Sequence, residues 1–206
     1  MKATNKMKSK ILTILLSFLF FLYSPSVLLA SESKAIFAGG CFWCLEHDFE
    51  GLKGVLSVKS GYSGGELEKP TYSNYKGHQE VILVTFNSDL ISYKELLENY
   101  WFNIDPFDGE GQFCDRGDSY RPIIFTSGDQ QNIDAKKSVE TISQILRVPK
   151  NKINVEIKDA NKFWIAEQYH QDFAEKNTIK YNFYRYSCGR DSRLKAVWGE
   201  AGEREK

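Results

Sequence analysis

The sequence has no excess charge of either sign, no internal repeat and no low-complexity tract. Its 206 residues include 27 Lys and Arg against 27 Asp and Glu. This balance gives no reason to expect nucleic acid or an acidic surface as a partner. With 42% hydrophobic and 14% aromatic residues, the chain can still bury a sizeable core. The length and composition therefore indicate one globular domain.

A long apolar run occurs at the N-terminus, where lysines precede Ile11–Tyr23 and Ser24-Pro25-Ser26 ends the run. A basic start, an apolar stretch and the small residues Ala30-Ser31 are typical of a secretory signal peptide over residues 1–30. An uncleaved anchor is the alternative, because Ile11–Ala30 is just long enough to span a bilayer. Either way we expect a bacterial protein that is exported, periplasmic or membrane-anchored facing the periplasm. The catalytic domain would cover residues 31–199, followed by a charged tail at 200–206. We expect the charged end from Arg193 to Lys206 to fray.

Cysteine is scarce, with four residues in the whole chain: Cys41, Cys44, Cys114 and Cys188. A framework of structural disulfides is one hypothesis for an exported protein, and it predicts no free thiol. However, a domain of this size can form a core without such bonds. A bond between Cys41 and Cys44 would also close too short a loop to stabilise the fold much. The pattern favours catalytic cysteines.

The motif Gly40-Cys41-Phe42-Trp43-Cys44 follows a short apolar strand, Ala35–Ala38, and opens a helical pattern. A cysteine at a helix N-terminus lies beside free backbone N–H groups, which favour its thiolate form. The adjacent aromatic rings provide an apolar surface. The motif predicts redox or nucleophilic sulfur chemistry on a small, weakly polar substrate.

Several other interpretations of these cysteines and the histidines stay open at this point. A zinc site would need two more ligands, yet Cys114 and Cys188 each lack a nearby partner cysteine. A thioredoxin-like dithiol of Cys41 and Cys44 fits a first helix in a βαβ unit. A thiol-dependent hydrolase would pair a cysteine with a histidine, but the spacing selects none of the three: His47, His78 and His170.

Hydrophobic periodicity predicts strands that alternate with helices. The predicted strands are 35–38, 55–59, 80–86, 123–125 and 153–157; the predicted helices begin near 42, 92, 130 and 166 and end near 52, 101, 146 and 176. Ser92 and Glu95 form a capping box at the second helix. The order β-α-β-β-α-β-α-β-α favours an α/β sandwich with a mixed sheet.

Two further regions carry polar groups that chemistry could use. Glu80 opens the third strand, and in an apolar pocket its raised pKa would make it a proton donor. Tyr62 lies in a glycine-rich turn and could place its hydroxyl in the same cleft. Asp115 and Tyr120 lie in a long loop before the fourth strand, and long ordered loops in compact domains are usually functional.

These residues resemble the peptide methionine sulfoxide reductase A family over essentially the whole chain after the signal segment. Six motifs occur in the family's order: Gly39-Gly40-Cys41-Phe42-Trp43, Gly61-Tyr62-Ser63-Gly64-Gly65, Gly77-His78-Gln79-Glu80-Val81, Asp115-Arg116-Gly117 with Tyr120-Arg121, Ala166-Glu167-Gln168-Tyr169-His170-Gln171, and Tyr186-Ser187-Cys188. The resemblance implies a two-layer α/β (α+β) sandwich of ferredoxin-like type. It also implies reduction of the S epimer of methionine sulfoxide, free and in proteins, as repair of oxidative damage.

The resemblance also implies a role for each site residue. Cys41 would attack the sulfoxide sulfur, Glu80 would protonate the departing oxygen, and Tyr62 and Tyr120 would hold that oxygen. Asp115 would support the substrate site, and Phe42 and Trp43 would contact the sulfoxide's methyl group. No metal or bound organic cofactor is required.

Oxygen transfer would leave a sulfenic acid on Cys41, which a second thiol must convert to a disulfide. The resemblance ranks Cys188 first as this resolving thiol, with Cys44 second and Cys114 third. A thioredoxin-type dithiol would then reduce the disulfide. We expect the enzyme to be a monomer. Asp118-Ser119 and Pro122 depart from the family pattern, which makes peptide preference harder to predict than catalysis.

Overall fold

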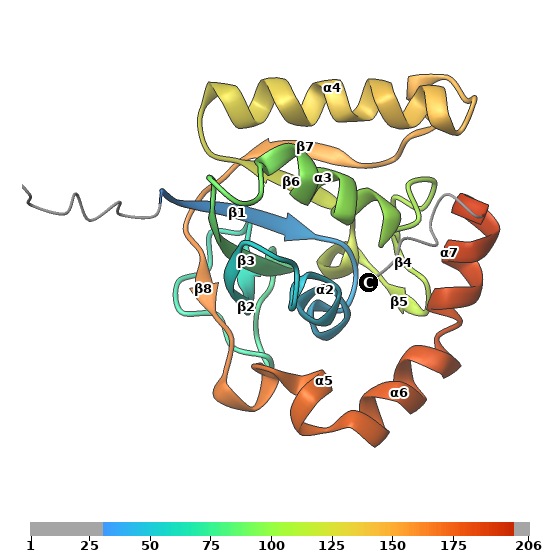
Figure 1. Cartoon of the computed structure of the whole chain (residues 1–206). Coiled ribbons are helices and arrows are strands. Elements are labelled where there is room, and N and C mark those ends of the chain that lie inside the picture. The colour runs from blue at the N-terminus through green and yellow to red at the C-terminus, as the bar shows by residue number, and fades with distance from the viewer. Residues whose placement is uncertain (1–30, 200–206) are drawn as a thin grey trace, which may run out of the picture. The chain divides into compact units, whose positions relative to one another are not determined.

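The computed structural model describes residues 31–199, in which strands and helices alternate (Figure 1). The N-terminal segment for which a signal peptide or anchor is expected lies outside this range. The described helices include none that is long and apolar enough to cross a membrane. The strands are β1 (Glu32–Ala38), β2 (Val55–Ser63), β3 (Gln79–Asn87), β4 (Gly111–Gln112), β5 (Asp115–Arg116), β6 (Ile123–Thr126), β7 (Glu156–Asp159) and β8 (Trp164–Ile165). The helices are α2 (Phe42–Phe49), α3 (Tyr93–Phe102), α4 (Asp129–Ile145), α5 (Phe173–Lys176), α6 (Thr178–Ser187) and α7 (Arg190–Trp198).

A six-stranded mixed sheet in the order β7-β6-β1-β3-β2-β8 forms the centre of the domain. Each strand from β6 to β8 in this order is antiparallel to the next, and only β7 joins its neighbour β6 in parallel. Read in chain order, β1, α2, β2, β3, α3 and β6 form the ferredoxin-like βαββαβ unit. The predicted fold class is confirmed.

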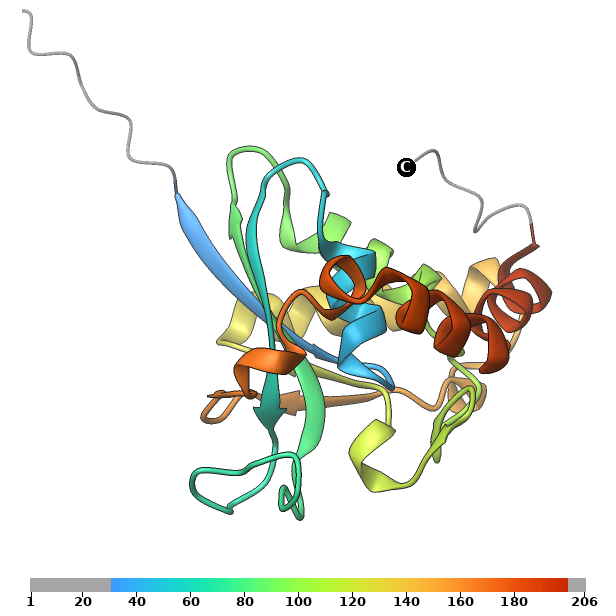
Figure 2. The same cartoon turned by 90° about the horizontal axis from the view of Figure 1, so that it is seen from below.

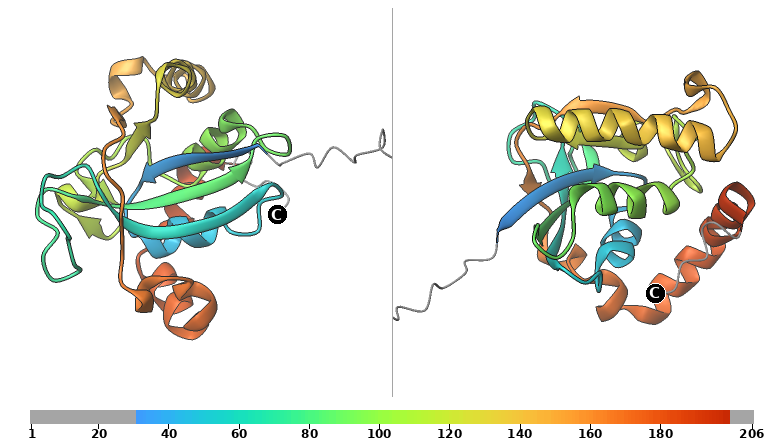
Figure 3. Two further views of the ribbon diagram at one scale, coloured as in Figure 1. Left: turned by 90° about the vertical axis from the view of Figure 1, so that its left-hand side faces the viewer. Right: turned by 45° about the horizontal axis from the view of Figure 1, so that its top comes forward.

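Side chains alternate between the two faces of the sheet because successive residues of a strand point in opposite directions. Phe37 of β1 points into the main core, beneath α2 and α3. Its neighbours Ile36 and Ala38 point to the other face, where they pack in a smaller cluster against Phe163. Helix α4 lies along β6 and β7, as Figure 3 shows. The helical layer therefore covers one face and positions α2 over the end of β1.

The C-terminal part of the chain differs most from the sequence prediction. A helix over 166–176 was expected, but only Phe173–Lys176 is α-helical. The preceding segment is irregular because Gln171 uses its side chain to bond the backbone of Ser60 and Ala166. Asp172 then adopts a left-handed conformation with φ 56°. Local pattern could not reveal these long-range hydrogen bonds.

Two more helices, α6 and α7, follow α5 (Figure 2), and α7 covers the start of the charged end from Arg193 that was expected to fray. Helix α7 is held by its two buried residues. Arg190 donates to the backbone carbonyl of Asn103, and the Trp198 indole donates to that of Ile104. Buried anchors of this kind order a segment whose own sequence is highly charged. The prediction of fraying was wrong for residues 193–198.

Candidate active site

Cys41 is the N-cap residue of α2 and lies where β1 ends. Gly40 precedes it with φ 85°, and a Cβ there would lie 2.8 Å from Cβ of Gln112. The chain can therefore turn sharply into the helix only with glycine at this position. The backbone N–H of Phe42, at the first helical turn, donates a 3.0 Å hydrogen bond to Oε2 of Glu80. The turn thus brings the thiol and the carboxyl group to one helix N-terminus.

A small pocket of about 60 Å³ opens at this helix N-terminus. The residues that line it come from the start of α2, the loop after β2, β3, β5, the turn after β5, and α6. They are Cys41, Phe42, Trp43, Tyr72, Glu80, Asp115, Tyr120 and Tyr184. The pocket combines one thiol, two carboxyl groups, three phenol hydroxyls and two apolar rings. All of the predicted substrate-binding residues and most of the predicted catalytic ones therefore meet in one place.

Glu80 is protonated around neutral pH in this environment. Its side chain is 2% exposed. Burial raises its pKa to about 8, and the charges of Asp115 and Cys44 act in the same direction. The hydrogen bonds from Phe42 and Tyr120 lower the pKa but do not offset burial. A carboxylic acid with a pKa near the ambient pH can donate a proton inside the pocket.

Tyr120 and Tyr72 supply hydroxyl groups to the pocket. Burial raises the pKa of Tyr72 to about 12 and also raises that of Tyr120, so both phenols keep their protons and can donate hydrogen bonds. The Tyr120 hydroxyl also lies 3.5 Å from that of Tyr75. Tyr72 was not predicted from the sequence because it lies in a polar loop without periodicity.

Tyr62 was predicted at the pocket; its side chain is fully buried and is not among the residues that line the pocket, although it lies opposite Glu80 in the pairing of β2 with β3. Its hydroxyl donates a 3.0 Å hydrogen bond to Oε2 of Glu167. The other carboxylate oxygen of Glu167 accepts the backbone N–H of Tyr72 at 2.9 Å. Tyr62 therefore supports the loop that carries Tyr72 through a shared carboxylate. The alternating residues of β2 explain this placement, because Tyr62 faces the main core.

Trp43 is locked in place by contacts from the C-terminal segment. Its ring stacks on Phe173 with centroids 3.7 Å apart. Its indole N–H donates a 3.0 Å hydrogen bond to Nδ1 of His170. Burial lowers the pKa of His170, which fits a neutral ring that accepts this bond. None of the pocket-lining residues is a histidine, and this disfavours the Cys–His hydrolase hypothesis.

Tyr184, on α6, joins the pocket to the C-terminal helices and was missed by sequence reasoning. Its hydroxyl donates a 2.6 Å hydrogen bond to Oδ2 of Asp115. It also hydrogen-bonds Cys41, which favours ionisation of that thiol. Burial raises the pKa of Asp115, whereas the Tyr184 bond and the charge of Arg190 oppose the rise. The aromatic-rich run before Cys188 was the only signal for Tyr184 in the sequence.

Cys41 and Cys44 are both free, buried and in mutual contact. The Cys41 thiol donates a hydrogen bond to Cys44. Burial raises the pKa of Cys41, in contrast to the lowered pKa expected at a helix N-terminus, because the thiol is only 6% exposed. For Cys44, this hydrogen bond and the charge of Arg190 lower the pKa against the effect of burial. Cys44 is therefore the thiol of the pair that ionises first, while Cys41 keeps its proton in the hydrogen bond to Cys44.

Cys188 forms a disulfide with Cys114 and not with Cys41. Their Cα atoms are 4.9 Å apart, and the bond ties the loop before β5 to the end of α6. Asp115, next to Cys114, lines the pocket. The bond thus lies beside the active site without reaching Cys41. A pairing of Cys41 with Cys188 was expected from the sequence, and the structure shows a different partner for Cys188.

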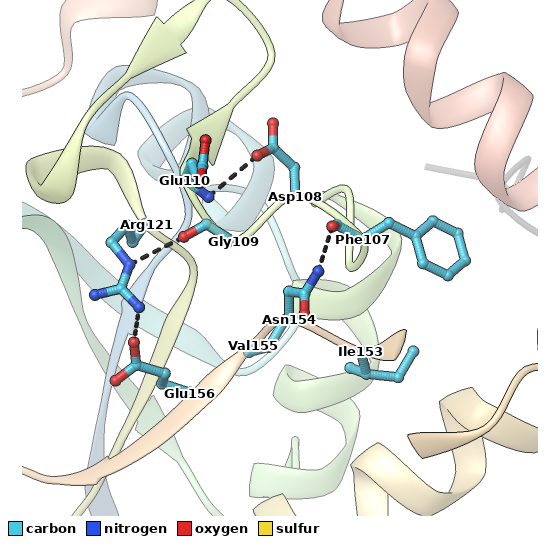
Figure 4. Close-up of a pocket in the computed structure, with 9 residues that line it drawn as sticks. All are labelled: Phe107, Asp108, Gly109, Glu110, Arg121, Ile153, Asn154, Val155 and Glu156. Carbon is cyan, nitrogen blue, oxygen red and sulfur yellow. Dashed lines mark hydrogen bonds and ion pairs between the residues drawn. The ribbon is translucent and has the colours of Figure 1, made fainter. Parts of the chain in front are cut away.

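A larger pocket of about 620 Å³ lies away from the thiols, and its lining residues are labelled in Figure 4. Its walls are mainly polar backbone and charged side chains. Arg121 donates to the carbonyl of Gly109 and forms an ion pair with Glu156, while Asn154 donates to the carbonyl of Phe107. These bonds hold both ends of the loop that carries Asp115 and Tyr120. This pocket supports the active-site loop and contains none of the predicted catalytic residues.

The described residues include two groups of side chains with metal-ligand spacing. One contains Cys114, Asp115 and Cys188, and its thiols are consumed by the disulfide. The other contains Glu46, Glu50 and Asp172. Neither contains Cys41 or Cys44. The zinc hypothesis for the Cys-x-x-Cys motif therefore gains no support from the described part of the chain.

Comparisons with known proteins agree with this geometry. A family model described as peptide methionine sulfoxide reductase matches residues 33–202. The peptide methionine sulfoxide reductase MsrA 2 of Caulobacter vibrioides is 45% identical over 180 residues, covering 85% of this chain and 90% of that protein. The peptide methionine sulfoxide reductase MsrA of Bacillus licheniformis is 44% identical over 169 residues, covering 80% of this chain and 93% of that protein.

Solved structures show the same fold. Methionine sulfoxide reductase A of Corynebacterium diphtheriae superposes with a TM-score of 0.66 at 27% identity, covering 73% of this chain and 77% of that one. Mxr1 of Saccharomyces cerevisiae in reduced form superposes with a TM-score of 0.65 at 30% identity, covering 76% of this chain and 89% of that one. The chain belongs to the peptide methionine sulfoxide reductase family.

Proposed function

We propose that the protein reduces the S epimer of methionine sulfoxide to methionine, both free and in oxidised proteins. The observation that carries this proposal is a thiol, a protonated carboxylic acid and two phenol hydroxyls around one small pocket with an apolar wall. The reduction of a sulfoxide has three requirements. Its sulfur must be attacked, its oxygen must be protonated to leave, and its methyl group needs an apolar contact.

The reaction follows from the positions of the groups. The methyl group of the substrate lies against Phe42 and Trp43, while its oxygen accepts hydrogen bonds from Tyr72 and Tyr120. The Cys41 sulfur attacks the sulfoxide sulfur, and Glu80 protonates the oxygen. The oxygen is transferred to Cys41, so that the sulfoxide and the thiol become methionine and a sulfenic acid. Glu80 regains its proton from the thiol that was consumed.

Cys44 is the thiol that the geometry favours for the next step. It contacts Cys41, whereas Cys188 is already bonded to Cys114. Condensation of the sulfenic acid with the Cys44 thiol releases water and forms a Cys41–Cys44 disulfide. Cys188 can take part only after the Cys114–Cys188 bond has been reduced. This proposal reverses the order of Cys188 and Cys44 that the family resemblance implied.

Electrons then enter from a dithiol of thioredoxin type. The dithiol reduces the Cys114–Cys188 bond, and the Cys188 thiolate attacks the Cys41–Cys44 disulfide. Cys114 then closes on Cys188 again and returns the active-site pair to its thiols. Each exchange transfers two electrons and leaves one disulfide. The less buried position of Cys114 makes this pair the accessible one for a protein reductant.

We propose further that the enzyme works outside the cytoplasm, as a monomer. The support for the location is the basic, apolar and small-residue pattern of residues 1–30. An exported repair enzyme meets oxidants directly, but it needs a reductant delivered to that compartment. Cell fractionation with an epitope at the C-terminus, together with the mass of the mature protein, tests both location and cleavage.

The decisive test is an assay of purified protein with each sulfoxide epimer and dithiothreitol as reductant. We expect turnover of the S epimer and negligible turnover of the R epimer. The second candidate function, a general dithiol oxidoreductase, is favoured only by the Cys41–Cys44 pair. It requires reduction of insulin disulfides and inactivity toward both sulfoxides. That result would overturn the proposal.

A further inference from the structure

Arg190, the first residue of α7, places a positive charge inside the protein, because it is only 1% exposed. Its Nη2 atom donates to the carbonyl of Asn103 at 2.6 Å and lies 3.4 Å from Oδ2 of Asp48. The guanidinium carbon lies 4.5 Å from the centre of the Phe113 ring. The Nε atom is buried and has no acceptor. A buried guanidinium with an unused donor retains positive charge that a further anion can balance.

This guanidinium lies beside the helix that carries the two free thiols. Its Nη1 atom is 3.8 Å from the point where a Cβ atom of Gly40 would lie, directly before Cys41. Asp48, which Nη2 contacts, follows Cys44 by four residues on α2. Residues four apart lie on the same face of a helix. Arg190 therefore extends along the part of α2 that carries Cys44.

The charged and titratable groups that act on Cys44 come from α2, β3, α6 and α7. They are Cys41 and Asp48, Glu80, Tyr181 and Arg185, and Arg190. Burial keeps Glu80 protonated around neutral pH and raises the pKa of Tyr181, so both of these groups are neutral. Arg185 pairs at 2.7 Å with Asp48 and at 2.7 Å with the exposed carboxylate of Asp191. Cys44 thus faces two guanidinium groups that share one buried carboxylate.

An excess of buried positive charge favours a thiolate. The hydrogen bond from Cys41 and then the charge of Arg190 lower the pKa of Cys44 against burial, while Asp48 opposes them. Once Cys41 is part of a disulfide, it has no S–H to donate. The charge of Arg190 persists in that state and can still stabilise a thiolate on Cys44.

We propose that Arg190 is a positioning residue that makes Cys44 the leaving sulfur when the Cys41–Cys44 disulfide is reduced. This inference rests on the proposed function and specifies one step of its recycling. The Cys188 thiolate attacks the sulfur of Cys41, a Cys41–Cys188 bond forms, and the Cys41–Cys44 bond breaks. Cys44 takes the electron pair and leaves as a thiolate beside the guanidinium. The sulfur that forms the more stable thiolate leaves faster.

The first measurement is thiolate absorbance at 240 nm as pH rises, on the full chain with its disulfide intact. Cys41 and Cys44 are then the thiols that titrate. The step that disappears in Cys44→Ser belongs to Cys44. Arg190→Met should move this step to higher pH, and Arg190→Lys, which keeps a positive charge, should move it less. Asp48→Asn removes the opposing carboxylate and should move the step to lower pH.

The second measurement is the rate at which dithiothreitol reduces the Cys41–Cys44 disulfide, followed by alkylation and peptide mapping. The disulfide is made with diamide and not with a sulfoxide, so failure of this inference can be distinguished from failure of the proposed function. Arg190→Met should slow the reduction about fivefold or more at pH 7, because the leaving thiolate loses its neighbouring cation.

Trp198→Phe is the matched control, because it removes the other buried anchor of α7, the hydrogen bond to the Ile104 carbonyl. It should change neither the titration nor the reduction rate. If Arg190 only anchors α7, Trp198→Phe and Arg190→Met would have the same effects, and this would overturn the proposal. So would an unchanged Cys44 step in Arg190→Met, or a step that moves to higher pH in Asp48→Asn. Arg190→Lys and Asp48→Asn keep the test decisive if Arg190→Met does not fold.

Discussion

The two cysteine pairs of this protein lie in opposite environments. Cys41 and Cys44 are free and buried on α2, next to a carboxyl group whose pKa is raised to about 8. Cys114 and Cys188 are bonded, and they join a loop to the end of α6 nearer the surface. A buried thiol is protected from adventitious oxidation, whereas an accessible disulfide can meet a protein dithiol. The difference suggests that one pair performs the chemistry and the other receives the electrons.

The largest expected effect comes from removing the nucleophile. Cys41→Ser should reduce turnover of the S epimer by at least about a thousandfold, because a hydroxyl is barely ionised and far less nucleophilic than a thiolate. The measurement is methionine formed per enzyme in a single turnover. Cys114→Ser is the matched control and should still form one equivalent of product. Substantial product from Cys41→Ser would contradict the whole assignment.

Removing the acid should have the next largest effect. Glu80→Gln keeps the shape but cannot donate the proton, so the single-turnover rate should fall about a hundredfold. In the unmodified enzyme the rate should also fall as pH rises through about 8, because Glu80 then loses its proton. The variant should lack that step in its pH profile. An unchanged rate in Glu80→Gln would assign the proton to Tyr72, Tyr120 or water.

The same group links pH to stability. Because the pKa of folded Glu80 lies above its unfolded value, the folded state binds the proton more tightly. Its protonation favours folding at low pH, and this contribution is lost as pH rises from about 4.5 to about 8. Urea unfolding across this range should show a smaller loss of stability in Glu80→Gln than in the unmodified protein.

The two cysteine pairs can be separated directly. Cys44→Ser should leave the first equivalent of methionine intact but slow steady turnover with a thioredoxin-type reductant by about tenfold or more, because the sulfenic acid lacks its adjacent thiol. Cys188→Ser should also keep the first equivalent and lose turnover with the protein reductant. Dithiothreitol, which is small enough to reach Cys41, should restore part of both activities. Peptide mapping after one turnover should reveal a Cys41–Cys44 bond; a dominant Cys41–Cys188 bond would show that the tail cysteine resolves first.

The smallest effects should distinguish two tyrosines. Tyr72→Phe removes a hydroxyl from the pocket and should lower kcat/KM about tenfold. Tyr62→Phe removes a buried hydrogen bond to Glu167 instead and should cost about 1 kcal/mol of stability. Its kcat/KM should fall less, and only through the loop that carries Tyr72. A larger catalytic loss in Tyr62→Phe than in Tyr72→Phe would reverse the placement of the two hydroxyls.

Much of the site was predictable from local sequence. The double glycine before Cys41 and the helical spacing after it place the thiol at a helix N-terminus. The residues that follow Glu80 in its strand are mostly apolar, so a carboxyl group at the start of that strand becomes buried. The depth at which Tyr62 is buried was not evident from its glycine-rich turn, because that burial follows from the pairing of β2 with β3 and from core packing.

Other parts depended on contacts between distant segments. Tyr184 reaches the pocket only because α6 returns to α2, and nothing in its local sequence indicates that approach. The helix expected over 166–176 was interrupted because Gln171 bonds to β2, 111 residues away in sequence. Such long-range hydrogen bonds override local helical preference, which is worth only a fraction of a kcal/mol per residue.

The sequence by itself determined the βαββαβ order, the thiol at the start of α2 and the acid at the start of β3. Those features follow from hydrophobic period and from the few residues that permit sharp turns, and both are local properties. Only the tertiary structure decided which cysteines are paired, which tyrosines face the pocket and which buried charges act on Cys44. These outcomes depend on the packing of segments that are far apart along the chain, because burial and charge act through space.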